Sequence, residues 1–313
     1  MWHNPYKNRK SMHSETSSGH SQPFTAEALF SLGFGNTRED LNDKTEKADN
    51  MKALITGASS GIGRDFAHVL GSMGCELILV ARRENRMEEL RNELPVPVQI
   101  ICADLSSERE CFALYEQVRE EHIDILINNA GFGVFGAFQE TDLTEELKLI
   151  DTNIRAVHIL TKLFLKDFTA RDAGYLLNVS SASAFAPGPL MAAYYASKVY
   201  VLHLTLAIWK ELRRQNSRVS ISALCPGPVN TEFDLKADVT FTPASKPSYQ
   251  IAEYALKQMF AHRMLIVPGL QMKLAKCSAR FLPTRAVLAV SYHLQHRRQP
   301  KRTAISKSLP RSN

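Results

Sequence analysis

The sequence lacks the features that are typical of membrane-spanning proteins, secreted proteins and proteins with structural zinc sites. No uncharged apolar run approaches the ~18 residues of a transmembrane helix, and the N-terminus has no apolar core like that of a secretory signal peptide. The five cysteines are widely spaced, without a CxxC pair, and the ten histidines form no ligand motif with a carboxylate. We therefore expect an intracellular, cytoplasmic protein, soluble or at most peripheral, with no bound metal.

Positive charge is in excess, and its location restricts what it can mean. The formal net charge is +6, which invites a nucleic-acid or membrane interpretation. The last 17 residues hold six basic side chains and no acidic one: Arg297, Arg298, Lys301, Arg302, Lys307 and Arg311. A solvated basic tail at 297–313 is the simpler interpretation, and weak contact with an anionic membrane surface is the alternative. We predict no nucleic-acid partner.

Composition divides the chain into one domain with extensions. Residues 1–50 are polar and too poor in apolar side chains to pack alone, which predicts disorder; a start codon assigned too early is the other explanation. The ordered pattern then begins at once and continues over 51–269 as a single domain. Residues 231–250 contain prolines between polar side chains and fit a flexible flap. Residues 270–296 read as one amphipathic helix, packed on the domain or lying on a membrane.

Short β-rich runs alternate with longer helical segments through the domain. The runs are apolar and nearly continuous instead of alternating, which is typical of strands covered on both faces. They occupy residues 52–58, 76–81, 98–105, 124–130, 175–181, 219–227 and 264–269. With 44% hydrophobic residues, the chain can bury a large core. We predict an α/β fold of Rossmann type, a doubly wound, about seven-stranded parallel sheet with helices on both faces.

A glycine-rich turn follows the first strand. The segment TGASSGIG, residues 56–63, has glycine at 57, 61 and 63. This spacing gives a tight turn, a close backbone approach, and a helix N-terminus whose free N–H groups attract anions. Because a strand precedes it and an amphipathic helix follows it, the turn predicts a pyrophosphate site.

The TGxxxGxG spacing resembles that of the short-chain dehydrogenase/reductase family, and further landmarks follow in order. They are NNAG at 128–131, Ser181, Tyr194 with Lys198, and PG at 226–227, so the resemblance covers residues 51 to about 270. It implies an oxidoreductase that interconverts a carbonyl and an alcohol by hydride transfer with a nicotinamide cofactor. By the same resemblance the cofactor contacts Thr56, Gly57, Ser59, Ser60, Gly61, Ile62, Gly63, Leu105, Asn129, Ala130, Gly131, Tyr194, Lys198, Pro226, Gly227 and Thr231.

The end of the second strand bears on which nicotinamide is used. An acidic residue there binds the ribose 2′-OH of NAD, whereas arginine suits the 2′-phosphate of NADP. This sequence has Arg82 and Arg83 at that point, which favours NADP(H); an inward Glu84 would weaken the preference. Asp104 resembles the family residue that contacts the adenine ring, and capping the next helix is its alternative role.

Two adjacent tyrosines precede the lysine in AAYYASKVYV, residues 192–201. On a helix, spacings of i,i+4 and i,i+3 both bring a tyrosine near Lys198, so spacing prefers Tyr194 only slightly over Tyr195. The resemblance supplies the YxxxK motif, which assigns Tyr194 as the general acid/base and leaves Tyr195 a packing or substrate-lining role. The pKa of a free phenol is near ~10, which is too high for acid/base catalysis at neutral pH, so the site must lower it. A neighbouring ammonium does so because it favours the phenolate.

The resemblance also gives roles to one serine and one asparagine. Ser181 would donate a hydrogen bond to the substrate carbonyl, with Ser180 and Ser183 as competitors. Asn153 matches the family residue that orders a water linked to the lysine. Because asparagine inside a helix costs propensity, we expect something to compensate it.

The sequence indicates the class of substrate less clearly than it indicates the cofactor. By family analogy the segments after Ser181 and after NNAG line the substrate cleft, and their apolar side chains suit a hydrophobic ketone, steroid or acyl chain. Those side chains are Phe132, Phe135, Phe185, Leu190 and Met191, and core packing is the alternative for each. The family implies a homodimer or homotetramer formed through the helices that bear Asn153 and Tyr194. A non-catalytic NADP(H)-binding sensor and a membrane-surface protein acting through the basic tail remain alternative functions.

Overall fold

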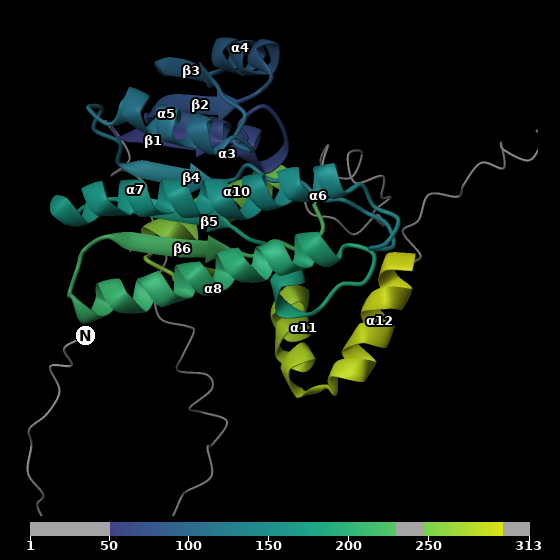
Figure 1. Ribbon diagram of the computed structural model, residues 1–313. Helices are drawn as coiled ribbons and strands as arrows, with labels where there is room; N and C mark the ends of the chain where they lie inside the picture. The colour runs from purple at the N-terminus through teal and green to yellow at the C-terminus, as the bar shows by residue number, and fades with distance from the viewer. Residues whose placement is uncertain (1–50, 230–246, 297–313) are drawn as a thin grey trace, which may run out of the picture. The chain divides into compact units, whose positions relative to one another are not determined.

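The computed structural model of the chain describes residues 51–229 and 247–296, and a seven-stranded parallel sheet runs through them (Figure 1). The strand order is β3-β2-β1-β4-β5-β6-β7, and every neighbouring pair is parallel. The strands are β1 (Lys52–Thr56), β2 (Glu76–Ala81), β3 (Val98–Cys102), β4 (Ile125–Asn128), β5 (Tyr175–Val179), β6 (Ser220–Leu224) and β7 (Leu265–Ile266). The predicted fold is confirmed.

The apolar runs are continuous because the sheet has a core on each face. In β1, Ala53 and Ile55 belong to one hydrophobic cluster, whereas Leu54 between them belongs to the other. In β2 the same alternation sends Leu77 to the first cluster and Ile78 to the second. Successive side chains of a strand point to opposite faces, so a strand covered on both sides needs an apolar residue at every position.

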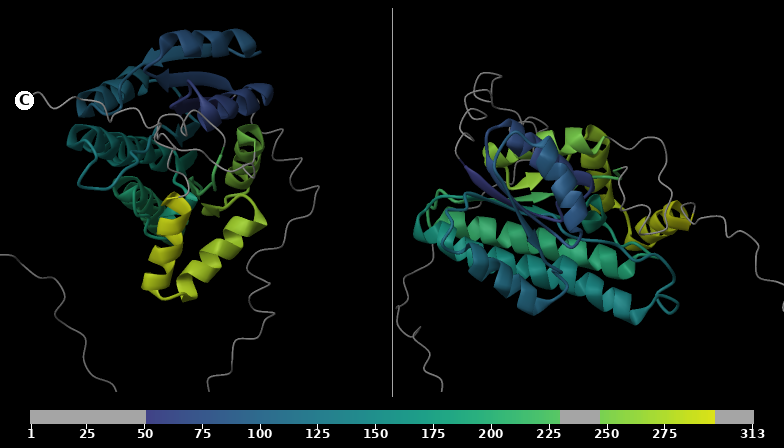
Figure 2. Two further views of the ribbon diagram at one scale, coloured as in Figure 1. Left: turned by 90° about the vertical axis from the view of Figure 1, so that its right-hand side faces the viewer. Right: turned by 90° about the horizontal axis from the view of Figure 1, so that it is seen from above.

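Two layers of helices cover these faces (Figure 2). The first layer consists of α3 (Gly61–Ser72), α4 (Glu84–Glu93) and α10 (Ser248–Phe260). Phe66 of α3, Met87 of α4 and Met259 of α10 are fully buried in it. The second layer consists of α5 (Glu108–Val118), α7 (Val157–Ala170) and α8 (Ala192–Arg214), with Phe164 and Phe168 of α7 buried. Removing one such phenylalanine side chain would cost ~3–5 kcal/mol.

The strand order reverses at β1, which has β2 on one side and β4 on the other. The connection that leaves β1 therefore runs to one face of the sheet and the connection that leaves β4 runs to the other, which leaves a crevice at the carboxyl ends of these two strands. Short elements border this edge: α6 (Leu143–Ile150), a π-helical turn η2 (Asp151–Ala156) and a 3₁₀ turn η3 (Ala182–Phe185). The site is expected at this edge.

The C-terminal segment differs from the prediction of one helix over 270–296. It forms two helices, α11 (Leu270–Phe281) and α12 (Thr284–His296), arranged as a hairpin (Figure 1). Pro283 lies in the break because it has no N–H to continue α11, and its carbonyl accepts from the N–H of Ala286 at 2.9 Å as α12 begins. None of the helices in the described parts of the chain has both the length and the apolar character needed to cross a bilayer.

Three predicted segments lie wholly or mostly outside the described residues. They are the N-terminal extension at 1–50, the basic tail at 297–313, and residues 231–246 of the predicted flap.

Candidate active site

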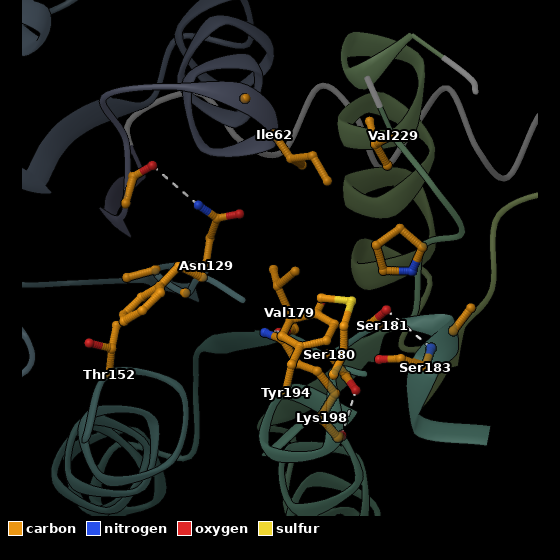
Figure 3. Close-up of a pocket in the computed structure, with 18 of the residues that line it drawn as sticks. Ile62, Asn129, Thr152, Val179, Ser180, Ser181, Ser183, Tyr194, Lys198 and Val229 are labelled. Atoms are coloured by element: carbon orange, nitrogen blue, oxygen red, sulfur yellow. Dashed lines mark hydrogen bonds between the residues drawn. The ribbon is translucent and has the colours of Figure 1, made fainter. Parts of the chain in front are cut away.

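A cavity of about 580 Å³ lies at the carboxyl ends of the strands. Its walls come from the turns after β1, β2, β4, β5 and β6, from α8, and from the α11–α12 hairpin. Figure 3 shows Ser181, Tyr194 and Lys198 on one side of this pocket and Ile62 across from them. The sheet edge therefore gathers segments that are far apart in the sequence.

The glycine turn is packed too closely for side chains. A Cβ added to Gly63 would lie 2.3 Å from the carbonyl oxygen of Gly57 and 2.5 Å from the amide nitrogen of Asn129, which no side chain can accept. Ser60 is the N-cap residue of α3, but its side chain accepts no hydrogen bond from the first N–H groups of the helix. These N–H groups lie beside the pocket. An anionic group fits such a helix start.

Hydrogen bonds tie the glycine turn to the NNAG segment. The hydroxyl of Thr56 accepts from the backbone N–H groups of Asn129 at 3.0 Å and Ala130 at 3.1 Å. The side-chain amide of Asn129 donates back to the carbonyl of Thr56 at 3.0 Å. Thr56 is 1% exposed, so it does not line the pocket and instead holds together two segments that do.

Arg82 and Arg83 both line the pocket after β2, and Glu84 does not. The Arg83 guanidinium donates to the Ser59 hydroxyl at 3.2 Å. Arg82 lies 3.8 Å from an Asp104 carboxylate oxygen, with its side chain 58% exposed. Partial burial raises the pKa of Asp104, but hydrogen bonds from Ser106 and the charge of Arg82 outweigh it and hold that pKa below its usual range. Two guanidinium groups thus border this end of the pocket.

Ser181 and Ser183 both line the pocket and hydrogen-bond Tyr194, whereas Ser180 makes a different contact. Ser180 is 2% exposed and donates its hydroxyl hydrogen to the carbonyl of Lys198 at 2.7 Å, so it ties β5 to α8. The Ser181 hydroxyl accepts from the N–H of Ser183 at 3.1 Å, which caps the 3₁₀ turn and fixes the side chain at the pocket wall (Figure 3).

The two tyrosines occupy different surroundings. Burial raises the pKa of Tyr194 to about 12, although hydrogen bonds with Ser181 and Ser183 pull it down. The Tyr195 hydroxyl instead accepts from the side-chain amide of Gln295 on α12. Its ring also lies so close to Gly188 that a Cβ there would approach within 2.3 Å. Tyr194 is therefore the tyrosine that lies with the candidate serine.

Lys198 is 5% exposed and lies next to Tyr194. Its ammonium nitrogen is 5.7 Å from the centroid of the Tyr194 ring and donates to the carbonyl of Val179 at 3.0 Å. Burial disfavours the charged form and lowers the pKa of Lys198 to about 8. The lysine thus remains mostly protonated at neutral pH, close to the phenol.

Asn153 lies behind the pocket wall and is 0% exposed. Its side-chain amide donates to the carbonyl of Phe132 at 2.9 Å and accepts from the N–H of Phe132 at 3.1 Å. It also donates to the Ser197 hydroxyl at 3.1 Å. These bonds and the π-helical turn are the compensation that its helical position required. Its role with a water stays a prediction.

Most residues predicted to contact the cofactor line the pocket. The exceptions are Thr56 and Gly63, which lie behind it, and Thr231, which is outside the described residues. Among the residues predicted to contact substrate, Phe132 and Met191 line the pocket, but Phe135, Phe185 and Leu190 do not. Phe185 packs instead against buried residues of α8 and β6, and Phe135 against Met191.

The hairpin contributes a wall of the pocket that could not be predicted from the sequence. Its residues are Met272, Leu282, Val287, Val290, Ser291 and Gln295. The apolar periodicity of 270–296 indicated that one face of the predicted helix would be buried. Nothing in the sequence indicated that this face would pack over the pocket.

Comparison with known proteins places the chain among oxidoreductases. A family model described as short chain dehydrogenase matches residues 51–239. A solved short-chain dehydrogenase from Sphingobium yanoikuyae in complex with NADPH is 30% identical, with a TM-score of 0.67 over 74% of this chain and 94% of that one. The bulky-bulky ketone specific alcohol dehydrogenase from Comamonas testosteroni is 29% identical, with a TM-score of 0.65 over 74% and 93%.

One relative is described as lacking activity. The inactive hydroxysteroid dehydrogenase-like protein 1 from Homo sapiens is 31% identical over 190 residues, which cover 58% of this chain and 56% of that protein. Similarity at this level therefore does not by itself decide turnover.

Proposed function

The chain belongs to the short chain dehydrogenase family, and from this premise we propose that it interconverts a hydrophobic ketone or acyl carbonyl and the corresponding alcohol with NADP(H). The observation that carries the proposal is the placement of Ser181, Tyr194 and Lys198 together at one wall of the pocket. The glycine turn and the two arginines border the same cavity, so a nucleotide and a carbonyl substrate could share it.

In the reductive direction, each of these side chains has a separate task. The Tyr194 phenol is protonated at neutral pH and donates its proton to the carbonyl oxygen as that oxygen gains charge. The Ser181 hydroxyl donates a hydrogen bond to the same oxygen. The Lys198 ammonium stabilises the phenolate that remains. When bound, NADPH supplies the hydride to the carbonyl carbon, so a proton and a hydride together convert the ketone to the alcohol.

The preference for NADP(H) is supported by Arg82 and Arg83 at the end of β2. Both arginines line the pocket, whereas the neighbouring Glu84 does not. A guanidinium binds a phosphate dianion through charge-assisted hydrogen bonds. A solved relative at 30% identity was obtained with NADPH, which is consistent with this choice.

A hydrophobic substrate is supported by the side chains around the reacting group. Phe132, Met191, Val229, Met272 and Val287 contribute apolar surface to the pocket, whereas a sugar would require more polar partners. A relative specific for bulky ketones shares the fold at 29% identity.

The test is NADPH oxidation by the purified chain with a panel of bulky ketones, steroids and β-ketoacyl thioesters, with NADH as the cofactor control. We expect turnover that needs NADPH. NADPH binding without turnover on any substrate class would favour the alternative, a nucleotide-binding sensor without catalytic activity.

We also propose that the chain forms a homodimer or homotetramer through the helices that bear Asn153 and Tyr194. Tyr200 on α8 is 37% exposed, and its hydroxyl pairs with the ring of His158 on α7 at 2.6 Å, so the two helices present one continuous surface. Light scattering coupled to size exclusion measures the mass directly, and a monomer at micromolar concentration would reject the proposal.

A further inference from the structure

The α11–α12 hairpin carries an unusual concentration of exposed apolar side chains. Of the fifteen large hydrophobic residues that are exposed in the described parts of the chain, seven lie in the segment from Leu270 to Tyr292. Two of these, Leu282 and Val290, line the pocket, and the other five do not. Phe281 is 80% exposed, Leu270 71% and Leu274 62%. Contiguous exposed apolar surface of this kind marks a contact with another body.

The exposed residues of α11 form one stripe. Leu270, Leu274, Cys277 and Phe281 are exposed, and their spacing of four, three and four residues puts them on one helical face. Met272, which lines the pocket, lies nearly opposite. The helix therefore covers the pocket with one face and leaves a second apolar face without a described partner.

On α12, Arg285, Leu288 and Tyr292 are exposed at helical spacing, whereas Val287, which points in a different direction around the helix, lines the pocket. The hairpin thus has an inner side, made of pocket-lining residues, and an outer side. We define the outer side as Leu270, Lys273, Leu274, Phe281, Arg285, Leu288 and Tyr292. Figure 1 shows the hairpin extending away from the sheet, and the side chains of its outer side are exposed.

Charge decides what covers this side. The hairpin segment contains four basic residues and no acidic one, and the sequence has no aspartate or glutamate after Glu253. A second copy of the hairpin would bring like charges together. A nucleic acid would leave the leucines and Phe281 in water. An anionic lipid surface accepts both the basic and the apolar side chains.

We propose that the outer side of the α11–α12 hairpin docks on an anionic phospholipid membrane surface, with the helices lying in the interface. The two helices, of 12 and 13 residues, are too short to span a bilayer, and lying in the plane is the geometry that such helices adopt. The proposal is independent of the reaction, because no residue of the outer side lines the pocket.

The experiment measures binding of the full chain to vesicles of phosphatidylcholine alone and of phosphatidylcholine with about one third phosphatidylserine. We expect binding to the anionic vesicles that is ~10-fold tighter than to the neutral ones and that weakens with salt. The pairs Leu274→Glu with Phe281→Glu, and Lys273→Glu with Arg285→Glu, should each weaken it ~10-fold or more.

Matched controls lie outside the hairpin. Leu143→Glu on α6 alters a leucine that is 68% exposed, and Lys257→Glu on α10 reverses an exposed lysine; both should leave vesicle binding unchanged. Binding of NADPH by each variant verifies the fold and reports on the nucleotide site separately, so a failed reductase assay does not affect the result.

Three outcomes would overturn the proposal. In the first, the hairpin variants bind anionic vesicles as well as the wild type does. In the second, binding is lost only when residues 297–313 are deleted, which would assign it to the tail. In the third, the wild type ignores vesicles and the hairpin variants change its mass in light scattering, which would identify a second copy of the chain as the occupant.

Discussion

The two walls of the pocket are held in place by different means. The wall at the strand ends is fixed by buried hydrogen bonds, such as those from Ser180 to the Lys198 carbonyl and from Asn153 to Phe132. The hairpin wall contacts this wall through the Gln295 to Tyr195 hydrogen bond and the packing of Met272 near Gly227. The difference indicates that the first wall positions reacting groups, which requires rigidity, and that the second shapes a binding space.

Replacing Tyr194 tests the rigid wall most severely. Tyr194→Phe removes the proton donor and keeps the ring, so kcat for ketone reduction should fall ~10³-fold. Tyr195→Phe removes the hydroxyl that accepts from Gln295 and should change kcat less than ~10-fold. Steady-state kinetics of both variants, with NADPH binding as the fold control, measure the difference. Equal losses in the two variants would mean that the acid had been assigned to the wrong tyrosine.

Lys198→Met should lower kcat ~10²-fold and stabilise the fold at neutral pH. Burial lowers the pKa of Lys198 to about 8 from an ordinary value of 10.5, so the folded protein bears a penalty for the charged form. Between these pH values the unfolded chain binds more protons than the folded one, and the stability of the wild type therefore rises with pH. Below pH 8 the penalty is fully present.

Thermal unfolding checks this prediction. The variant also loses the hydrogen bond to Val179, worth ~1 kcal/mol, so a net gain of a few degrees in Tm at pH 7 is expected. The gain should shrink as the pH rises from 8 towards 10.5. A gain that is independent of pH would contradict the burial of a charged amine as its cause. In the wild type, the rate of reduction should also decline above pH 8 as Lys198 loses its proton.

Changing both arginines tests the nucleotide end of the same wall. In Arg82→Ser with Arg83→Ser, the ratio of kcat/KM for NADPH to that for NADH should fall ~30-fold, since charge-assisted hydrogen bonds to the phosphate are lost. The NADH value itself should change little. Glu84→Gln is the matched control, because that carboxylate does not line the pocket. A fall for both cofactors together would indicate damage to the Ser59 turn, which Arg83 contacts.

The residues of the rigid wall could be predicted from the sequence because they are close together along the chain. Ser181, Tyr194 and Lys198 lie on short connections after β5 and on one helix, so their relation is fixed locally and a motif can record it. The continuous apolar strands likewise identify the sheet. Phe135 and Phe185 pack against buried neighbours and do not line the pocket, which is the alternative left open for them, because an apolar residue near the site packs equally well into the core.

The hairpin escaped prediction for a physical reason of a different kind. The break at Pro283 is a local signal that the continuous periodicity of 270–296 obscured. What Met272 and Val287 cover depends on the approach of α11 to β6 and η3, which are distant in sequence. An amphipathic pattern predicts which face of a helix is buried, but it does not predict the surface against which that face packs.

The smallest effect is expected on the hairpin wall and tests whether it is only a binding surface. Met272→Ala removes apolar contact with a bulky substrate, so KM for a large ketone should rise up to ~10-fold while kcat changes little, the signature of lost uniform binding. A small ketone that does not reach the hairpin should show no change. Leu274→Ala, on the outer side, is the control and should leave both constants as they are in the absence of lipid. If Met272→Ala instead lowered kcat as strongly as Lys198→Met, the hairpin would be holding the reacting groups as well, and the two walls would act as one.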